Sequence, residues 1–242
     1  MKHLDLFSGI GGFAYAADQV WDNLEHVFCD NNRFCQRVIE KHWKGSKIYN
    51  DIRDIKDEQA DILTGGFPCQ PFSQVGKRKG TADDRYLWPE MLRVIRLSKP
   101  KWVIAENVGG LLTVQNGLVF EQVCTDLEDS GYEVQPFIIP AAGVSAPHKR
   151  DRIWICAYAN SSKHKPQEHR RANSKTNSLQ SQERQTLYPW RSGGTSDSSD
   201  WIKAATELCG VDNGLPNRVD RLKSLGNGIV PQIAVEIMKG LR

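Results

Sequence analysis

The run Asp5-Leu6-Phe7-Ser8-Gly9-Ile10-Gly11-Gly12-Phe13 follows a short apolar segment and precedes an alanine-rich helical pattern that begins at Ala14. A strand, a glycine-rich turn and a helix are therefore predicted in that order. Glycines in such a turn let backbone amides approach a ligand closely, and the start of a helix favours negative charge. This arrangement suits the nucleotide portion of a cofactor, although it is not a full dinucleotide-binding motif. A glycine turn without a ligand is the alternative.

Short β-like runs alternate with helical patterns from the first residues to about residue 159. This alternation favours a parallel sheet that is covered by helices. We predict strands at 3–7, 26–29, 62–63, 102–105, 134–139 and 152–157. We predict helices at 33–42, 87–97, 119–130 and, near the C-terminus, 230–237.

The composition is that of an ordinary globular protein, with 242 residues, 39% hydrophobic residues and 25% charged residues. The six cysteines are scattered, without a Cys-x-x-Cys pair or a compact cluster of Cys and His, so neither a zinc site nor a disulfide framework is indicated. We expect reduced thiols, no metal and a cytoplasmic protein, because no apolar run reaches membrane-spanning length and no signal-peptide pattern follows Met1. The formal net charge of +3 is too small to indicate a polyanionic partner by itself.

A lone cysteine, Cys69, lies in the run Gly65-Gly66-Phe67-Pro68-Cys69-Gln70-Pro71-Phe72-Ser73, just past the predicted strand at 62–63. Proline on both sides restricts the backbone and prevents the run from continuing as a helix or a central strand. A thiol on such a stiff loop is displayed as a nucleophile would be. A buried structural cysteine is the alternative, because free cysteines are among the most buried residues.

Two aspartates stand at or after predicted strand ends. Asp30 ends the second strand, where a Rossmann-like fold places the acid that binds ribose hydroxyls. A cap for the helix at 33–42 is the alternative role for this side chain. Asp51 precedes Ile52 at a further candidate strand end.

A carboxylate and two guanidinium groups are predicted at the same edge of the sheet. Glu106 leaves the strand at 102–105 at the ligand-binding end, and an exposed loop glutamate is the alternative. Arg150 and Arg152 alternate along an extended chain and should share one face. Two guanidinium groups beside an acid and a thiol suit an anionic substrate, whereas a solvated basic edge is the alternative.

From 160 to about 200 the sequence changes to Ser, Thr, Asn, Gln, Lys and Arg with very few aliphatic residues. Such a segment cannot build a core of its own. Between 160 and 191, seven basic residues stand against two acidic ones, which gives a local net charge of +5. This charge suits phosphate groups, and a solvated linker is the alternative.

These motifs, in this order, resemble those of the cytosine-5 DNA methyltransferase family. The resemblance implies the Rossmann-like α/β fold of S-adenosylmethionine-dependent methyltransferases, with a mostly parallel sheet, helices on both faces and a small polar target-recognition lobe. It implies a catalytic and cofactor-binding domain at 1–159, a short target-recognition region at 160–211 and a C-terminal segment at 212–242 that returns to the catalytic domain. The stretches that carry it are the runs at 5–13 and 65–73, Glu106-Asn107-Val108, the Arg-x-Arg of Arg150 and Arg152, and Gly226-Asn227-Gly228-Ile229-Val230-Pro231-Gln232.

The same resemblance implies a binding site for S-adenosylmethionine. Phe7 would stack on the adenine ring, and Asp30 would accept from the ribose hydroxyls, where the family more often has glutamate. Asp51 would accept from the adenine amino group, with Ile52 packed on the ring. The full set implied for the cofactor is Phe7, Ser8, Gly9, Ile10, Gly11, Gly12, Asp30, Asn31, Asp51, Ile52, Pro68, Leu87, Asn227 and Gly228.

For catalysis, the resemblance implies that Cys69 adds to carbon 6 of a cytosine that is flipped out of duplex DNA. Glu106 would hold N3 and the exocyclic amino group, and Asn107 would order the Cys69 loop. Arg150 and Arg152 would grip the base carbonyl and the phosphate. One departure from the family pattern is His148, at a position where the family usually has glutamine.

DNA contacts are expected in two stretches. The segment 74–85 carries Gly and basic residues and is expected to close over the flipped base. The basic segment at 160–200 stands where this family keeps its target-recognition region. The residues expected to contact DNA are Gln70, Ser73, Lys77, Arg78, Arg85, Arg170 and Arg171.

The sequence therefore predicts a monomeric, sequence-specific DNA cytosine-5 methyltransferase of a bacterial cell or a phage-infected host, associated with the nucleoid, with or without a partner restriction endonuclease. A transfer-RNA methyltransferase of the same fold is the first alternative. A catalytically silent DNA-binding relative is the second, but it would not need Cys69, Glu106 and the glycine turn together. NAD-dependent oxidation is disfavoured, because hydride transfer has no use for the Pro-Cys-Gln loop.

Overall fold

The computed structural model describes residues 1–68, 86–146, 148–159 and 218–241. The chain divides into two units, of which the first comprises residues 1–163 and 223–242 and the second residues 164–222. All described strands belong to the first unit. Helix α6 (Arg218–Asn227) crosses the boundary, and its residues from Lys223 onward belong to the first unit.

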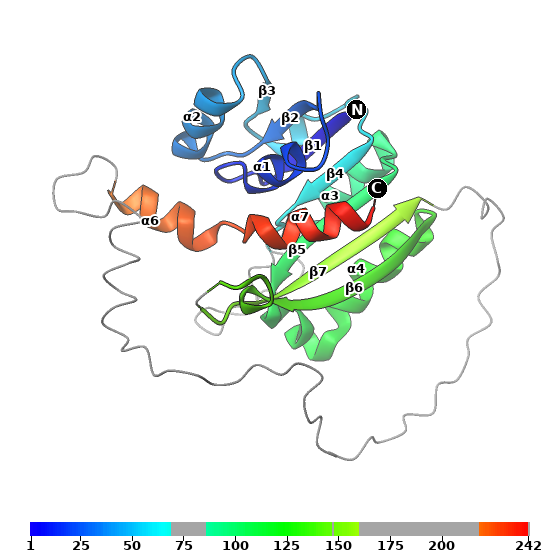
Figure 1. The fold of residues 1–242 in the computed structure, drawn as a ribbon. Helices are drawn as coiled ribbons and strands as arrows, with labels where there is room; N and C mark the ends of the chain where they lie inside the picture. The colour runs from blue at the N-terminus through cyan, green and yellow to red at the C-terminus, as the bar shows by residue number, and fades with distance from the viewer. Residues whose placement is uncertain (69–85, 147, 160–217, 242) are drawn as a thin grey trace, which may run out of the picture. The chain divides into compact units, whose positions relative to one another are not determined.

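One mixed sheet forms the centre of the first unit (Figure 1). Its strands follow the order β3-β2-β1-β4-β5-β7-β6 within the described residues. The pairs from β3 to β5 are parallel, whereas β7 runs antiparallel to both β5 and β6, so the expected mostly parallel sheet is confirmed with an antiparallel edge. The strands are β1 (Lys2–Leu6), β2 (Glu25–Cys29), β3 (Lys47–Tyr49), β4 (Ile62–Gly65), β5 (Trp102–Val108), β6 (Tyr132–Pro140) and β7 (Asp151–Ala159).

The helices begin and end where local sequence signals place them. The side chain of Asn32 accepts from the backbone amides of Phe34 and Cys35 and so caps the start of α2. Proline stands in the first turn of α3 and of α7, where its missing amide costs no helical hydrogen bond. The helices are α1 (Gly12–Asp18), α2 (Arg33–His42), α3 (Trp88–Ser98), α4 (Leu118–Asp129), α6 and α7 (Pro231–Gly240), with short 3₁₀ turns η1 (Ile52–Asp54), η3 (Gly109–Leu112), η4 (Val114–Gly117) and η5 (Ala141–Val144).

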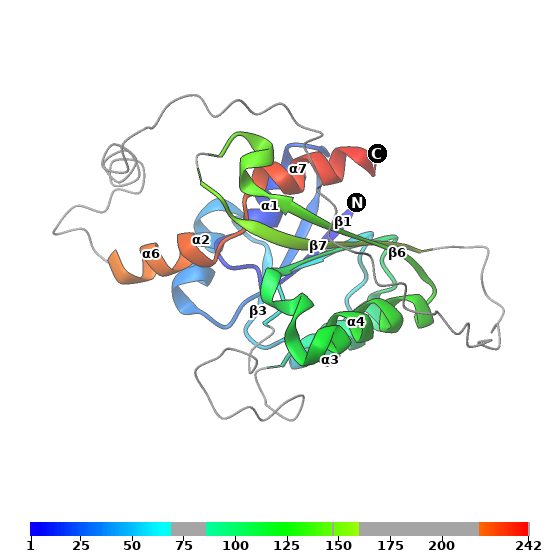
Figure 2. The same ribbon diagram turned by 90° about the horizontal axis from the view of Figure 1, so that it is seen from below.

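The helices cover both faces of the sheet (Figure 2). Alternate residues of a strand point to opposite faces, so Leu4 and Leu6 of β1 pack into the cluster that includes α3 and α4. On the other face, Ile104 and Trp154 pack with buried residues of α1 and α7. Burial of both clusters fixes the register of the strands, because a slip by one residue would reverse the faces.

The face of the sheet that α1 covers also holds a buried network of hydrogen-bonded side chains. His3 Nδ1 lies 2.9 Å from His26 Nδ1, and His3 Nε2 lies 2.8 Å from Thr64 Oγ1. Thr64 donates in turn to Asp5 Oδ1, and His26 Nε2 meets Asp18 Oδ1, each at 2.8 Å. Burial, followed by the nearby His26, lowers the pKa of His3 to about 3, while burial is the main cause that raises the pKa of Asp5. These linked bonds satisfy polar groups that would otherwise destabilise the sheet.

The strand order places one edge of the sheet to receive a ligand. After β1 the chain forms β2 and β3 on one side, and it later forms β4 and β5 on the other side. Open α/β sheets bind ligands at the carboxyl ends of the strands where the order reverses in this way. Because β7 is antiparallel to β5, the start of β7 reaches the same edge, and Arg152 pairs with Val108 there.

Candidate functional site

The loop after β1 brings the backbone close to this edge. Phe7, Gly9 and Gly11 have φ angles of 55°, 55° and 86°, which lie in the left-handed region. Ser8 holds the loop, because its hydroxyl donates to Asp5 O at 2.5 Å and its amide donates to Cys29 O at 3.1 Å. The non-glycine Phe7 therefore carries backbone strain of the kind that gathers at functional sites.

Replacing Gly11 with alanine should destabilise the protein more than replacing Gly9 with alanine. Both substitutions place a β-carbon at a positive φ, at about 1–2 kcal/mol each. A β-carbon on Gly11 would also come within 2.4 Å of the Trp43 ring, whereas one on Gly9 would meet nothing within 4 Å. Trp43 cannot yield freely, because its Nε1 donates to Asp18 at 2.9 Å.

We expect the clash to add roughly 1–3 kcal/mol to the loss at Gly11, as overpacking does elsewhere. Urea unfolding of the two purified variants measures the difference. Equal losses in the free energy of unfolding would show that Trp43 does not confine the loop.

Asp30 closes the loop from the end of β2. Its Oδ2 accepts from the amide of Gly9 and its Oδ1 from the amide of Asn32, both at 2.8 Å. The alternative role predicted for Asp30, as the cap of α2, is wrong, because Asn32 caps that helix. Burial raises the pKa of Asp30, against the two amide bonds that lower it. Each carboxylate oxygen keeps a lone pair for a hydroxyl group of a ligand.

A pocket of about 250 Å³ opens over this loop. Its volume is just below the range of about 300–1,000 Å³ that is usual for small-molecule sites. A methyl group built on Gly9 would meet no atom within 4 Å, so the space above the loop is open. The wall consists of Phe7, Ser8, Gly9, Ile10, Gly12, Phe13, Asp30, Asn32, Cys35, Gly66, Glu106, Lys223, Ser224, Asn227, Gly228 and Ile229.

The C-terminal segment forms one side of this pocket, as the sequence predicted for Asn227 and Gly228. Ile229 packs so closely on the glycine loop that a β-carbon on Gly12 would lie 2.9 Å from its Cγ1. Cys35 of α2 lies 3.8 Å from the hydroxyl of Ser224, measured from sulfur to oxygen. Glycine at position 12 is therefore needed for the close approach of the two segments.

Glu106 reaches the pocket from β5 and is 8% exposed. Burial raises its pKa to about 6, although the positive charges of Arg152 and Arg150 oppose that shift. Arg152 Nε lies 3.0 Å from Glu106 Oε1. A β-carbon on Gly66, after β4, would lie 3.5 Å from Glu106 Oε2. The carboxyl group thus faces the segment that leads into Cys69, and it can hold a proton near neutral pH.

Asn107 holds the same segment. Its Nδ2 donates to Phe67 O at 2.9 Å, and its Oδ1 accepts from the amide of Val108 at 2.9 Å. Asn107 and Phe67 are both buried. Phe67 precedes Cys69 by two residues, so this bond fixes the backbone just before the predicted nucleophile.

The two arginines of the Arg-x-Arg motif have different partners. Arg152 makes the ion pair with Glu106, whereas Arg150 donates to the backbone carbonyls of Gly226 and Gly228. Arg150 precedes the first residue of β7. The motif therefore brings one guanidinium group to the carboxyl group and the other to the C-terminal segment.

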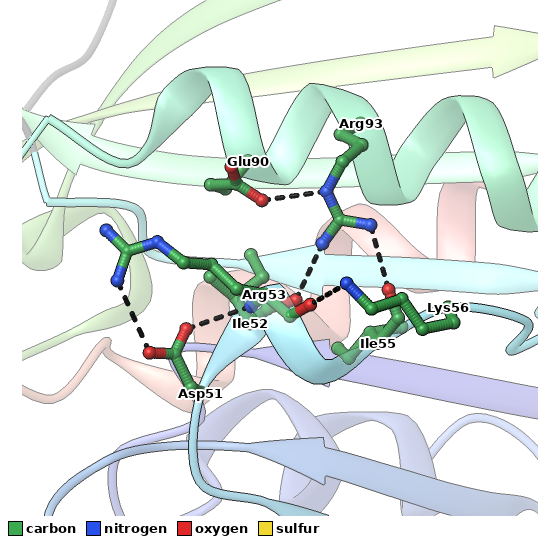
Figure 3. A network of polar contacts seen from close by, with 7 residues as sticks. All are labelled: Asp51, Ile52, Arg53, Ile55, Lys56, Glu90 and Arg93. Carbon is green, nitrogen blue, oxygen red and sulfur yellow. Dashed lines mark hydrogen bonds and ion pairs between the residues drawn. The ribbon is translucent and has the colours of Figure 1, made fainter.

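Figure 3 shows Asp51 and Ile52 at the start of the turn η1, in contact with Arg53 and Arg93. Neither residue lines the pocket. Asp51 accepts from the amide and the guanidinium group of its neighbour Arg53, and Ile52 is 3% exposed in the core. Arg93 of α3 fixes the turn by donating to Ile52 O and Ile55 O, both at 2.8 Å. Its Nε donates to Glu90 at 2.7 Å. All three nitrogens of the Arg93 guanidinium group therefore make hydrogen bonds.

The structure brings together only part of the predicted cofactor set. Gly11 lies under Trp43, and five further predicted residues also stay outside the wall, namely Asn31, Asp51, Ile52, Pro68 and Leu87. Sequence reasoning missed Phe13, Asn32, Cys35, Gly66, Lys223, Ser224 and Ile229. Of these, Phe13, Gly66 and Ile229 lie inside quoted motifs and could have been found there.

Other predicted residues lie outside the described residues. They are Cys69, Gln70, Ser73, Lys77, Arg78, Arg85, Arg170 and Arg171. In the described ranges, no group of three or more His, Cys, Asp and Glu side chains could hold a metal ion. None of the helices placed in those ranges is long and apolar enough to span a bilayer.

Comparison with known proteins gives a family match and several relatives. The family model described as C-5 cytosine-specific DNA methylase matches residues 1–204. The Type II methyltransferase M.NlaX of Neisseria lactamica is 33% identical over 166 residues, which cover 66% of this chain and 52% of that protein. The Type II methyltransferase M.BsuFI of Bacillus subtilis is 34% identical over 163 residues, which cover 65% of this chain and 39% of that protein.

Among solved structures, a DNMT2 variant of Spodoptera frugiperda matches with a TM-score of 0.56 and 24% identity. The match covers 67% of this chain and 51% of that chain, and it supports the α/β fold. The chain spans about half the length, or less, of the curated relatives described above.

Proposed function

Because this chain belongs to the C-5 cytosine-specific DNA methylase family, we propose that it transfers a methyl group from S-adenosylmethionine to carbon 5 of cytosine in a specific duplex DNA sequence. The observation that carries the proposal is the position of Glu106. Its buried carboxyl group, with a pKa near 6, lies beside Arg152 and faces the segment that leads into Cys69. A proton donor thus lies in the wall of a ligand pocket, beside the segment that precedes the proposed nucleophile in the sequence.

The residues of the pocket fit S-adenosylmethionine. Asp30 can accept from ribose hydroxyls while two amides hold it in place, and Phe7 offers an aromatic ring in the wall. The open space over Gly9 leaves room for a ligand against the backbone. When bound, this cofactor supplies an electrophilic methyl group on a sulfonium centre. We retain Asp51 and Ile52 as contacts to the adenine ring, although they lie outside the wall described above.

Cytosine carbon 5 is a weak nucleophile, and this is why the site needs both Cys69 and Glu106. The thiolate of Cys69 uses an electron pair to form a bond to carbon 6, and the electrons of the ring double bond shift toward carbon 5 and N3. Glu106 donates its proton to N3 and so neutralises the charge that develops there. After carbon 5 is methylated, loss of its proton to a base expels Cys69 as a thiolate, and Glu106 recovers its proton from N3.

Carbon 6 is shielded inside a duplex, so the target base must leave the stack, at a cost of about a few kcal/mol. We propose that the segment 74–85 closes over the flipped base and that the region 160–211, with its local excess of positive charge, contacts the DNA. Residues 1–159 and 212–242 then form the catalytic domain. We propose a restriction endonuclease as a further partner and the bacterial cytoplasm as the location; the curated relatives are Type II methyltransferases of bacteria.

Bisulfite sequencing tests this proposal. The full chain is expressed in a bacterium whose DNA lacks 5-methylcytosine, and converted DNA is sequenced. We expect protected cytosines at one short recurring sequence. Complete conversion in cells that accumulate the folded protein would contradict activity on DNA.

Replacing Phe7 with alanine should raise the KM for S-adenosylmethionine about tenfold, as loss of about 1.4 kcal/mol of stacking would. The fall in kcat should be smaller, because stacking is made equally in the ground state and the transition state. Phe7→Tyr is the matched control, since it keeps the ring and the β-carbon at the same strained φ. Steady-state kinetics measure both constants, and an unchanged KM in the alanine variant would place the adenine elsewhere.

A further inference from the structure

The side chain of Arg150 joins two parts of the sequence that lie far apart. Its Nη1 donates to Gly226 O at 2.9 Å and its Nη2 donates to Gly228 O at 2.8 Å. The backbone of Arg150 is itself fixed, because its carbonyl oxygen accepts from the amide of Ala141 at 3.1 Å. The side chain of Arg150 therefore connects the fixed backbone just before β7 to the C-terminal segment.

The end of α6 explains why a cation is needed there. The last carbonyl groups of a helix have no donor within the helix, and the end of the helix carries partial negative charge. The amide of Gly228 satisfies one of them, Ser224 O, at 2.9 Å. The last turn of α6 contains no basic residue, so Arg150 supplies the cation from outside. The fork of a guanidinium group suits two carbonyl oxygens, which an ammonium group cannot bind with the same geometry.

The clamped segment forms a wall of the pocket. Asn227, Gly228 and Ile229 line it, whereas Arg150 does not. Ile229 also packs against the glycine loop at Gly12. A displacement of this segment would therefore open the pocket, even though no atom of Arg150 lies in the wall.

We propose that Arg150 is a positioning residue, which clamps the segment 226–228 through two backbone carbonyls and so closes the S-adenosylmethionine pocket before DNA binds. The proposal rests on the proposed function, because it takes that cofactor as the ligand of the pocket. It assigns different tasks to the two arginines of the motif. Arg152 holds Glu106, and Arg150 holds the cofactor wall.

The charges around Arg150 agree with this assignment. Its Nε is buried and has no hydrogen-bond partner among the described residues, so the two Nη groups carry its polar contacts there. Burial, then the neighbouring Arg152, lowers the pKa of Arg150, and the negative charge of Glu106 opposes the shift. A partly buried cation with two carbonyl acceptors is fixed in place and is poorly placed to reach for a phosphate.

Calorimetric titration with S-adenosylmethionine, in the absence of DNA, tests the proposal. Arg150→Met loses both hydrogen bonds. If the pocket wall is then in its binding position in about one tenth of the molecules, the Kd for S-adenosylmethionine should rise about tenfold. Arg150→Lys keeps the charge and should recover only part of that affinity. Arg96→Met is the control, because Arg96 is exposed on α3 and bonds to Ser130. The control should bind within about twofold of the unmodified chain, since its contact is distant from the pocket wall.

Hydrogen exchange gives a second readout that does not depend on activity. Amides of residues 223–230 should exchange faster in Arg150→Met and Arg150→Lys, while those of β1 and β4 keep their protection. Equal cofactor affinity and equal exchange in all variants would overturn the clamp and leave the proposed function standing. A defect of Arg150→Met in DNA binding alone would also overturn it, in favour of a phosphate contact. If the unmodified chain binds no S-adenosylmethionine, the proposed function fails and the clamp fails with it.

Discussion

Replacing Cys69 with serine is expected to reduce methyl transfer by more than about a thousandfold, as the loss of other covalent nucleophiles does. A serine hydroxyl is far less ionised than a thiol near neutral pH, so addition to carbon 6 should fail. Binding of DNA and S-adenosylmethionine should survive, because the residues that form the pocket wall are unchanged. Transfer of tritiated methyl groups to DNA measures the loss.

Cys124→Ser is the matched control for this variant. Cys124 lies on α4, on the other face of the sheet from α1 and α7, and burial raises the pKa of its thiol to about 11. A thiol so rarely ionised is no nucleophile, and its replacement should leave the rate within about twofold. A serine variant at position 69 that retains a tenth of the rate would contradict covalent catalysis by Cys69.

Replacing Glu106 with glutamine is expected to lower kcat/KM about 100-fold or more at pH 6 and below, as the loss of a general acid does. The size of this loss should depend on pH. Because burial raises the pKa of Glu106 to about 6, the free enzyme holds the catalytic proton below that pH and loses it above. Glutamine has no such proton at any pH. The ratio of the two kcat/KM values should therefore be constant below about pH 6 and fall as the pH rises further.

The ratio isolates Glu106, because the ionisation of Cys69 affects both enzymes alike. Arg152→Met gives a check on the direction of the shift. The positive charge of Arg152 opposes the rise in the pKa of Glu106, so its removal should move the break in the profile to higher pH. A ratio that stays constant from pH 5 to pH 8 would show that Glu106 does not donate a proton in the rate-limiting step.

Local signals in the sequence predicted most elements of the fold. The helix predicted at 33–42 has those bounds in the structure, because apolar residues at helical spacing are readable in its sequence. Its cap, Asn32, was not predicted. The directions of β6 and β7 were not predicted, since periodicity does not say whether neighbouring strands run parallel or antiparallel. Strand β3 has three residues, and the sequence indicated only a candidate strand end near Asp51. Helix α6 has little amphipathic pattern and was not predicted.

The site was predictable where its residues follow strand ends and not where distant segments meet. Phe7 and Asp30 each follow a strand, Glu106 lies two residues before the end of β5, and all three line the pocket. The contact of Cys35 with Ser224 joins residues 189 positions apart and leaves no trace in a local pattern. The alternation of Arg150 and Arg152 predicted a shared face. The structure separates their partners, because Arg150 binds the carbonyl groups of Gly226, in the last turn of α6, and of Gly228, just after that helix.

Covalent trapping on fluorinated DNA tests the central claim most directly. A long duplex is prepared with 5-fluorocytosine in place of every cytosine, so that the recognition sequence need not be known. Fluorine cannot leave as a cation, so the adduct should persist after the methyl group is transferred. We predict a protein–DNA complex that resists denaturation, forms only with S-adenosylmethionine, and yields a cross-linked peptide containing Cys69. An adduct at another residue, or none while ordinary duplex DNA is methylated, would contradict attack by Cys69.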